Sequence, residues 1–113
     1  MEKQNVISAL AALAQDTRLD VFRLLVRAGP EGLAAGAIAD ALDLPSATLS
    51  FHLKELRNAG LALCERSGRS LIYRPDCAAV EDILRYLTEH CCEGVAVKKT
   101  RRGRASQSEE KAR

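Results

Sequence analysis

Residues 34–60 read AAGAIADALDLPSATLSFHLKELRNAG and carry the main structural signal of the chain. The small residues of 34–42 predict a short helix. Pro45 suits the first position of a second helix, which leaves a tight turn between the two. In that second helix, residues 45–58, Leu49, Leu53 and Leu56 share one face, and Gly60 ends it. The stretch therefore predicts two short helices joined by a tight turn.

Helical periodicity also precedes this stretch. Val6, Leu10 and Leu13 recur at helical spacing and predict a first helix over roughly residues 4–14. Asp16 is the expected N-cap of a second helix, which Gly29 and Pro30 terminate. Its apolar side is expected to carry Leu19, Phe22, Leu25 and Val26.

Strand signals and a last helix follow. Residues 61–66 and 70–74 are two extended runs around Ser67-Gly68-Arg69, which predicts a short hairpin. The last helix is expected from about Asp76 to His90. Its apolar stripe consists of Val80, Ile83, Leu84 and Leu87. The fold class is therefore mainly α with a small β-hairpin.

A small helix, a tight turn, a polar-faced helix and a hairpin, in that order, are typical of a winged helix-turn-helix. In such a unit the second helix enters the major groove of double-stranded DNA, and its N-terminal half faces the base edges. Taken singly, such polar residues are usual on a solvated helix face, and only their joint placement on this layout points to DNA. The residues expected to contact bases or phosphates are Ser46, Thr48, Ser50, His52, Lys54, Arg57, Arg66, Arg69 and Arg74.

The charge is divided unevenly between two regions. Residues 96–113 hold seven of the 17 basic and two of the 15 acidic residues, which leaves ten basic and 13 acidic residues in 1–95. We expect residues 1–95 to form the DNA-binding and dimerisation domain and 96–113 a basic, disordered tail. The tail either solubilises the protein or contacts phosphates without sequence preference.

Composition excludes several classes of protein. No apolar run approaches the ~18 residues that span a bilayer, and the N-terminus lacks the pattern of a signal peptide, so a cytoplasmic protein without membrane contact is expected. There is no phosphate-binding glycine loop and no Ser/His/Asp set, so we expect no enzyme. Thiols stay reduced in the cytosol, and the four cysteines are therefore interpreted as ligands, sensors or core residues; Cys64 is expected to be a core residue.

The motifs resemble the ArsR/SmtB family of metal-responsive repressors over roughly residues 8–93. The opening signature is ALAQDTRL at 12–19, the recognition helix is TLSFHLKEL at 48–56 followed by Ala59-Gly60-Leu61, and the wing carries Gly68-Arg69 and Tyr73-Arg74. The resemblance implies a homodimer built on the first and last helices. It also implies binding to an operator with an inverted repeat, release by an inducer, and no required cofactor.

The family's sensing sites lie at different places in the fold. A cysteine motif of the third helix corresponds here to Ala34, Ala35 and Gly36, which excludes that site. A zinc pattern on the last helix, shared between subunits, corresponds to Cys77, His90 and Glu93, with Ala79 in place of a ligand. Zinc therefore remains an alternative inducer.

Adjacent Cys91 and Cys92 form the third candidate site. Trivalent arsenic and antimony are thiophilic, and soft thiolates select such centres. Arsenite uses three thiolates and methylarsenite two, so Cys77 of the other subunit is the candidate third ligand. The sequence thus favours an arsenic- or antimony-responsive repressor, with thiol oxidation as a further alternative.

Overall fold

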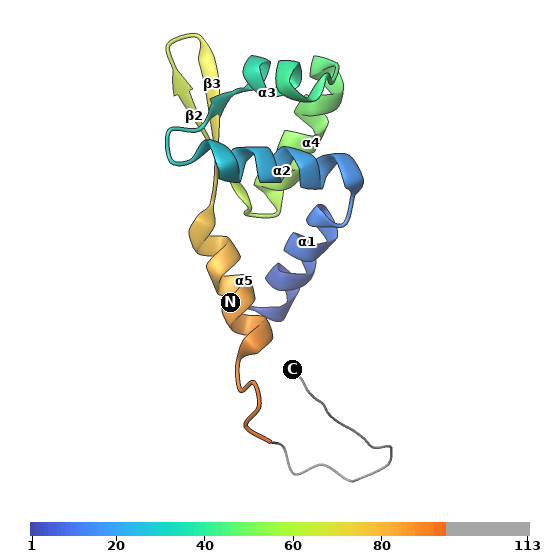
Figure 1. Cartoon of the computed structure of the whole chain (residues 1–113), viewed down its shortest axis with the longest axis vertical. Coiled ribbons are helices and arrows are strands. Elements are labelled where there is room, and N and C mark those ends of the chain that lie inside the picture. Colours follow the sequence, from blue (N-terminus) through green and yellow to red (C-terminus); the bar gives the residue numbers. More distant parts are fainter. Residues whose placement is uncertain (95–113) are drawn as a thin grey trace.

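The computed structural model describes residues 1–94, so the predicted tail 96–113 lies outside the described residues. The elements follow the chain in this order: α1 (Lys3–Leu13), α2 (Asp16–Ala28), β1 (Leu33–Ala34), α3 (Ala35–Leu42), α4 (Ser46–Asn58), β2 (Ala62–Ser67), β3 (Ser70–Pro75) and α5 (Cys77–Thr88). Helices α2, α3 and α4 and the hairpin form one end of the molecule, and α1 and α5 extend from them toward the other end (Figure 1). No described helix combines the length and apolar character that a membrane crossing requires. The predicted winged helix-turn-helix, mainly helical, is confirmed.

The wing contains one strand more than the predicted hairpin. β2 and β3 pair antiparallel from Ala62↔Pro75 to Ser67↔Ser70, and β1 adds to the other edge of β3 through Leu33↔Tyr73 and Ala34↔Ile72. The sheet order is β1-β3-β2. Two residues are too few to give an alternating pattern, so β1 was not predictable as a strand.

Most helix boundaries differ from the expected ones by one or two residues, and three of these differences concern caps and ends near the site. The cap of α2 is Gln15, whose side chain accepts a hydrogen bond from the Arg18 backbone N–H at 2.7 Å, while Asp16 is the first helical residue. Pro45 is the N-cap of α4 rather than its first helical residue. Helix α5 ends at Thr88, two residues before the expected end at His90.

The turns around α4 explain how it is oriented. Asp43 adopts a left-handed conformation (φ 53°), which Asp tolerates better than most residues, and this turns the chain sharply between α3 and α4. At the other end, Gly60 has φ 79°, and the Leu61 backbone N–H donates to the Leu56 carbonyl at 2.9 Å. This C-terminal motif directs the chain from α4 into the wing.

A single buried cluster joins the helices and the wing. Its members are Val6, Ala9, Ala12, Val21, Phe22, Leu25, Ile38, Leu49, Leu53, Leu56, Leu61, Ala62, Tyr73 and Ile83. The predicted face of α4 is thereby fixed in the core, and its opposite face is left exposed.

Candidate nucleic-acid interface and thiol site

Helix α4 carries several polar side chains on its outer surface. Ser46, Thr48, Ser50, Lys54 and Arg57 are all exposed, whereas Leu49, Leu53 and Leu56 are buried. Their exposure leaves all five free to contact a groove, and their contact with DNA stays a prediction.

His52 is the exception on this helix. It is 7% exposed, and its Nδ1 accepts a hydrogen bond from Nε of Arg18 at 3.3 Å. Burial lowers the pKa of His52, and the positive charge of Arg18 adds to this effect, while Glu55 opposes it. The expectation that His52 faces the bases is corrected: its ring belongs to the contact between α2 and α4.

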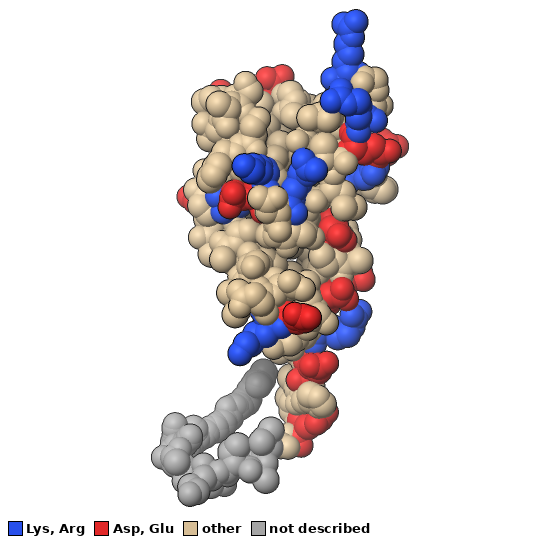
Figure 2. Space-filling model, turned by 180° about the vertical axis from the view of Figure 1, so that it is seen from behind, with Lys and Arg blue, Asp and Glu red and all other residues tan. Residues whose placement is uncertain are grey.

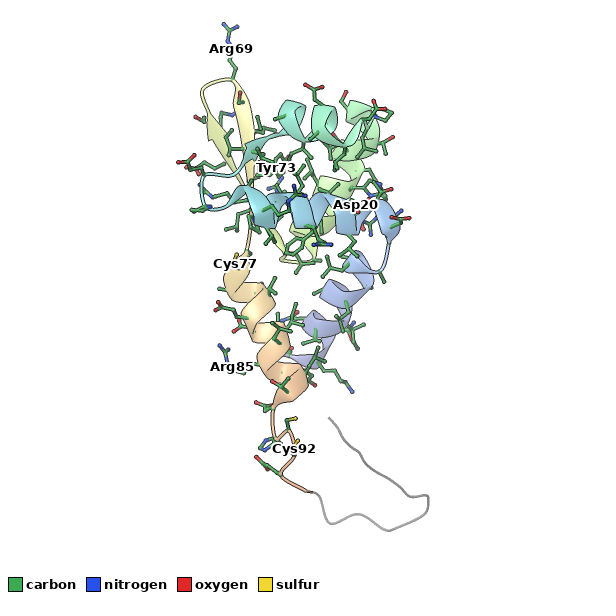
Figure 3. All side chains as sticks on the ribbon, in the orientation of Figure 1. Asp20, Arg69, Tyr73, Cys77, Arg85 and Cys92 are labelled. Carbon is green, nitrogen blue, oxygen red and sulfur yellow. The ribbon has the colours of Figure 1, made fainter. Side chains whose placement is uncertain are left out.

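The wing carries two exposed arginines, Arg66 and Arg69. Gly68 has φ 62° and forms the turn that brings Arg69 to the tip. Basic side chains, which in the hairpin are all arginines, project at the top of the view in Figure 2, and Figure 3 labels Arg69 there. Such an exposed cation at the end of a hairpin is suited to contact a phosphate.

Arg74 differs from these two arginines. It lies in β3 near the base of the wing, it is half-buried, and its guanidinium pairs with the Glu65 carboxylate. The neighbouring carboxylate offsets its charge, so Arg74 is less suited to a phosphate contact than the exposed arginines of the tip, and its expected contact stays an untested prediction.

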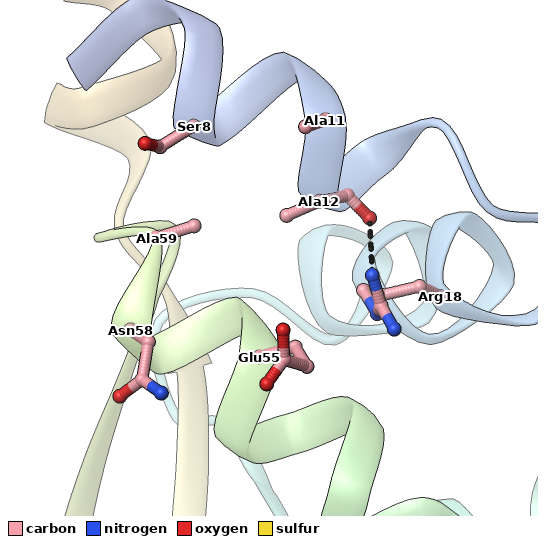
Figure 4. Close-up of a pocket in the computed structure, with 7 residues that line it drawn as sticks. All are labelled: Ser8, Ala11, Ala12, Arg18, Glu55, Asn58 and Ala59. Atoms are coloured by element: carbon pink, nitrogen blue, oxygen red, sulfur yellow. Dashed lines mark hydrogen bonds between the residues drawn. The ribbon is translucent and has the colours of Figure 1, made fainter. Parts of the chain in front are cut away.

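Arg18 was not among the expected residues, yet it connects three helices. Besides the bond to His52, its guanidinium donates to the Ala12 carbonyl at 3.3 Å, at the end of α1 (Figure 4). It borders an open hollow of about 390 Å³ between α1, α2 and α4, lined by Ser8, Ala11, Ala12, Arg18, Glu55, Asn58 and Ala59. Sequence spacing did not reveal this role because His52 is 34 residues away and the bond to Ala12 depends on how α1 packs against α2.

The vicinal thiols lie beyond α5. Cys91 and Cys92 are both exposed, and their Sγ atoms are 3.5 Å apart. They lie on a turn in which His90 and Cys92 both have φ 64°, and the Cys91 backbone N–H donates to the Thr88 carbonyl at 2.8 Å. The hydrogen bond with Cys92 is the main cause that raises the pKa of Cys91. The pair is therefore held as neighbouring thiols on the surface.

Cys77 lies at the opposite end of α5 (Figure 3). It is exposed and begins this 12-residue helix, whose length is about 18 Å at ~1.5 Å per residue. Within one chain Cys77 cannot join Cys91 and Cys92 at a common centre. Cys64, in contrast, is half-buried and packs against the core, as expected for it.

The residues of the alternative zinc set are only partly together. His90 Nδ1 and Glu93 Oε2 are 2.9 Å apart, but Cys77 is separated from them by the length of α5. Because α5 ends at Thr88, His90 and Glu93 are not on the helix that the zinc pattern requires. Within residues 1–94, no three His, Cys, Asp or Glu residues form a group that could hold a metal ion.

A family model described as a helix-turn-helix domain matches residues 13–65. The "HTH-type transcriptional regulator NmtR" of Mycobacterium tuberculosis is 40% identical over 68 residues, which are 60% of this chain and 54% of that protein. The chain spans little more than half the length of the curated relatives it matches.

Solved structures agree with this match. An ArsR-like transcriptional regulator from Rhodococcus sp. RHA1 has a TM-score of 0.71 and 27% identity, over 80% of this chain and 82% of that one. For fragment 1–100 of a Mycobacterium bovis protein, the crystal structure gives 32% identity and a TM-score of 0.60, over 75% of this chain and 85% of that one. Its solution structure is described as the homodimeric winged helix-turn-helix DNA-binding domain of a possible ArsR-family regulator. This structure has 26% identity and a TM-score of 0.61, over 84% of this chain and 88% of that one. This chain therefore belongs to the ArsR family of helix-turn-helix transcriptional regulators, and not to a family of enzymes.

Proposed function

We propose that this chain is a homodimeric repressor that leaves its DNA operator when trivalent arsenic or antimony bonds Cys91 and Cys92. The observation that carries the inducer assignment is the 3.5 Å separation of two exposed thiol sulfurs. Bonds from a metal to sulfur are about 2.3 Å for zinc, and two sulfurs on one such centre lie roughly 3–4 Å apart. The pair therefore needs little rearrangement to hold one soft centre.

DNA binding is assigned to α4 and the wing. The residues proposed to contact bases or phosphates are Ser46, Thr48, Ser50, Lys54, Arg57, Arg66 and Arg69, all of which are exposed. A two-fold symmetric dimer would place two copies of α4 in major grooves about 34 Å apart, or a multiple of this distance, on an inverted repeat.

Dimerisation is assigned to α1 and α5. Each of these helices exposes large apolar side chains: Ile7 and Leu10 on α1, and Leu84 and Leu87 on α5. These side chains remain in contact with water in a single chain, and a second copy would bury them.

The bonding step requires no oxidant. Each thiol transfers its proton to a hydroxyl group of the arsenical, that group leaves as water, and an As–S bond forms without a change in oxidation state. Two such exchanges satisfy a methylarsenical, whereas arsenite keeps a third position for a hydroxyl or for Cys77 of the other subunit. Release of DNA follows if the bonded form favours the conformation that binds DNA less tightly.

The test is fluorescence anisotropy of the reduced, full-length protein on a duplex that the protein selects from a randomised library. Arsenite, methylarsenite, antimonite, zinc and peroxide are added separately. We expect an arsenical to weaken DNA binding at least tenfold in the wild type and in Cys64→Ser, and to have no effect on Cys91→Ser/Cys92→Ser. If Cys77→Ser abolishes the response to arsenite but not to methylarsenite, Cys77 is the third ligand.

Zinc and peroxide supply the contrary outcomes. The contact between His90 and Glu93 favours zinc as the second candidate, since both are zinc ligands. If only zinc releases the DNA, and the double cysteine variant responds like the wild type, the inducer assignment is wrong. Release by peroxide alone assigns the same thiols to redox sensing.

A further inference from the structure

An aromatic side chain lies on the outer surface of α4. Phe51 is 55% exposed, whereas the other phenylalanine of the chain, Phe22, is 7% exposed and belongs to the core. Single exposed apolar side chains are common on protein surfaces, so it is the position of Phe51, on the helix proposed to enter the major groove, that points to an interaction.

Phe51 lies near the centre of the outward face of α4. At about 100° per residue, Ala47, Phe51 and Lys54 fall within roughly 30° of the direction opposite to the buried stripe. Ser50 and Thr48 lie at about 70° and 90° from that direction, on its two flanks. The middle of this face is thus apolar in its N-terminal half, where Ala47 and Phe51 are one turn apart.

The ring of Phe51 is held in place from one side. The guanidinium carbon of Arg18 is 5.6 Å from the ring centroid, and the His52 ring meets it edge-on with centroids 5.5 Å apart. Arg18 is itself fixed by the Ala12 carbonyl and His52. The Arg18 cation covers only one face of the Phe51 ring, so the rest of the ring can make another contact. Because this contact already restricts the Phe51 rotamer, less side-chain entropy is lost when DNA binds.

Within the major groove, the apolar group that distinguishes one base is the C5-methyl of thymine, which Ala and Phe side chains contact. We infer that Phe51, with Ala47 beside it, reads a thymine methyl group, so that each half-site carries a thymine facing this ring. The inference rests on the proposed binding of DNA by α4. Phe51 would then give a preference for one base, while the flanking hydroxyl groups of Thr48 and Ser50 and the ammonium group of Lys54 would contact other base edges and phosphates.

Replacing thymine by deoxyuridine removes only the methyl group and therefore tests the inference. The reduced, full-length protein first selects duplexes from a randomised library, and each thymine of the selected site is then replaced in turn. For the wild type, we expect replacement at one symmetric pair of thymines to matter. Replacing one thymine of the pair should weaken binding about fourfold, and replacing both should weaken it roughly fifteenfold. This is the fold-change that corresponds to about 0.8 kcal/mol for each buried methyl.

Two variants complete the test. Phe51→Ala should bind the thymine duplex more weakly and should bind the thymine and deoxyuridine duplexes equally at that position. Val26→Ala, a change at a similarly exposed apolar residue of α2, should keep the full preference for thymine. Thermal unfolding of both variants establishes that they are folded.

The outcomes separate the inference from the proposed function. If the protein selects a site but no thymine replacement alters binding, or if Phe51→Ala retains the wild-type preference, Phe51 does not read thymine. If no sequence is selected at all, the proposed binding of DNA by α4 fails, and this inference fails with it.

Discussion

His52 shows how one buried polar side chain is accommodated on α4. Its neutral ring can accept the hydrogen bond from Arg18, and protonation would place a second positive charge beside that guanidinium. The spacing of residues 49, 52, 53 and 56 already placed His52 on the apolar stripe, so its burial was predictable. The polarity of His52, rather than its position, led to the prediction that it faces the bases.

This burial predicts a pH dependence of stability. Because the folded-state pKa of His52 is lowered below its usual value near 6.5, the unfolded chain binds more protons, and stability falls as the pH falls through 6.5 toward the folded-state pKa. The thermal unfolding midpoint should therefore decrease between pH 7.5 and 5.5. His52→Asn, which keeps an acceptor for Arg18 without titrating there, should show a smaller decrease.

His90 is the matched control, because it is exposed and is the only other histidine. His90→Asn should retain the wild-type dependence on pH. If His90→Asn loses it and His52→Asn keeps it, the assignment of the titration to His52 is wrong.

The two types of wing arginine predict different dependences on salt. Replacing Arg69 by Ala removes one phosphate contact per subunit, and the slope of log K against log salt should fall by about 0.9 per contact, or about 1.8 for a dimer. Arg74→Ala should leave that slope unchanged, since Arg74 is paired with Glu65. Equal slopes for the wild type and Arg69→Ala would show that Arg69 does not contact a phosphate.

At the scale of elements, the connection from α2 to β1 depends on Gly32. Its φ is 75°, and a Cβ there would lie 2.6 Å from both the Tyr73 carbonyl oxygen and Arg74 Cγ. The carbonyl cannot move away without disturbing the pairing Leu33↔Tyr73. The small third strand therefore requires glycine at this position.

Two glycine substitutions give opposite predictions. Gly32→Ala should lower the free energy of unfolding by more than about 1 kcal/mol, through strain and steric conflict. Gly36→Ala, within α3 and with open space around it, should raise it by up to about 1 kcal/mol. Urea unfolding measures both, and a destabilised Gly36→Ala would contradict the description of α3.

The ends of the elements were less predictable than their order. Apolar periodicity predicted α1, α2, α4 and α5, and the small residues of 34–42 predicted α3, which completes the helices of residues 1–94. The end of α5 at Thr88 carries no Gly or Pro signal, and the two positive φ values that follow belong to His90 and Cys92. The candidate thiols were found from their residue type and adjacency, but their place on a turn was not.

At the scale of the whole molecule, the exposed apolar side chains of α1 and α5 predict self-association. Leu84→Glu/Leu87→Glu should weaken the dimer by roughly a hundredfold or more, since burying each leucine contributes about 1.5–3 kcal/mol. Sedimentation velocity at micromolar concentration should then detect monomers, and binding to an inverted repeat should fall accordingly.

The control places the same charges elsewhere. Leu63→Glu/Leu71→Glu alters two exposed leucines of the wing and should leave the sedimentation of the dimer unchanged. A dimer that persists in Leu84→Glu/Leu87→Glu, or that is lost equally in both variants, would remove α5 from the interface.

The exposed thiols are separate from the residues that hold the chain together. Cys77, Cys91 and Cys92 are all exposed, and none belongs to the buried cluster. Exchanging any of them costs the fold little. Under the proposed function, the inducer to which this scaffold responds could therefore be changed by substitutions at these positions without loss of the fold.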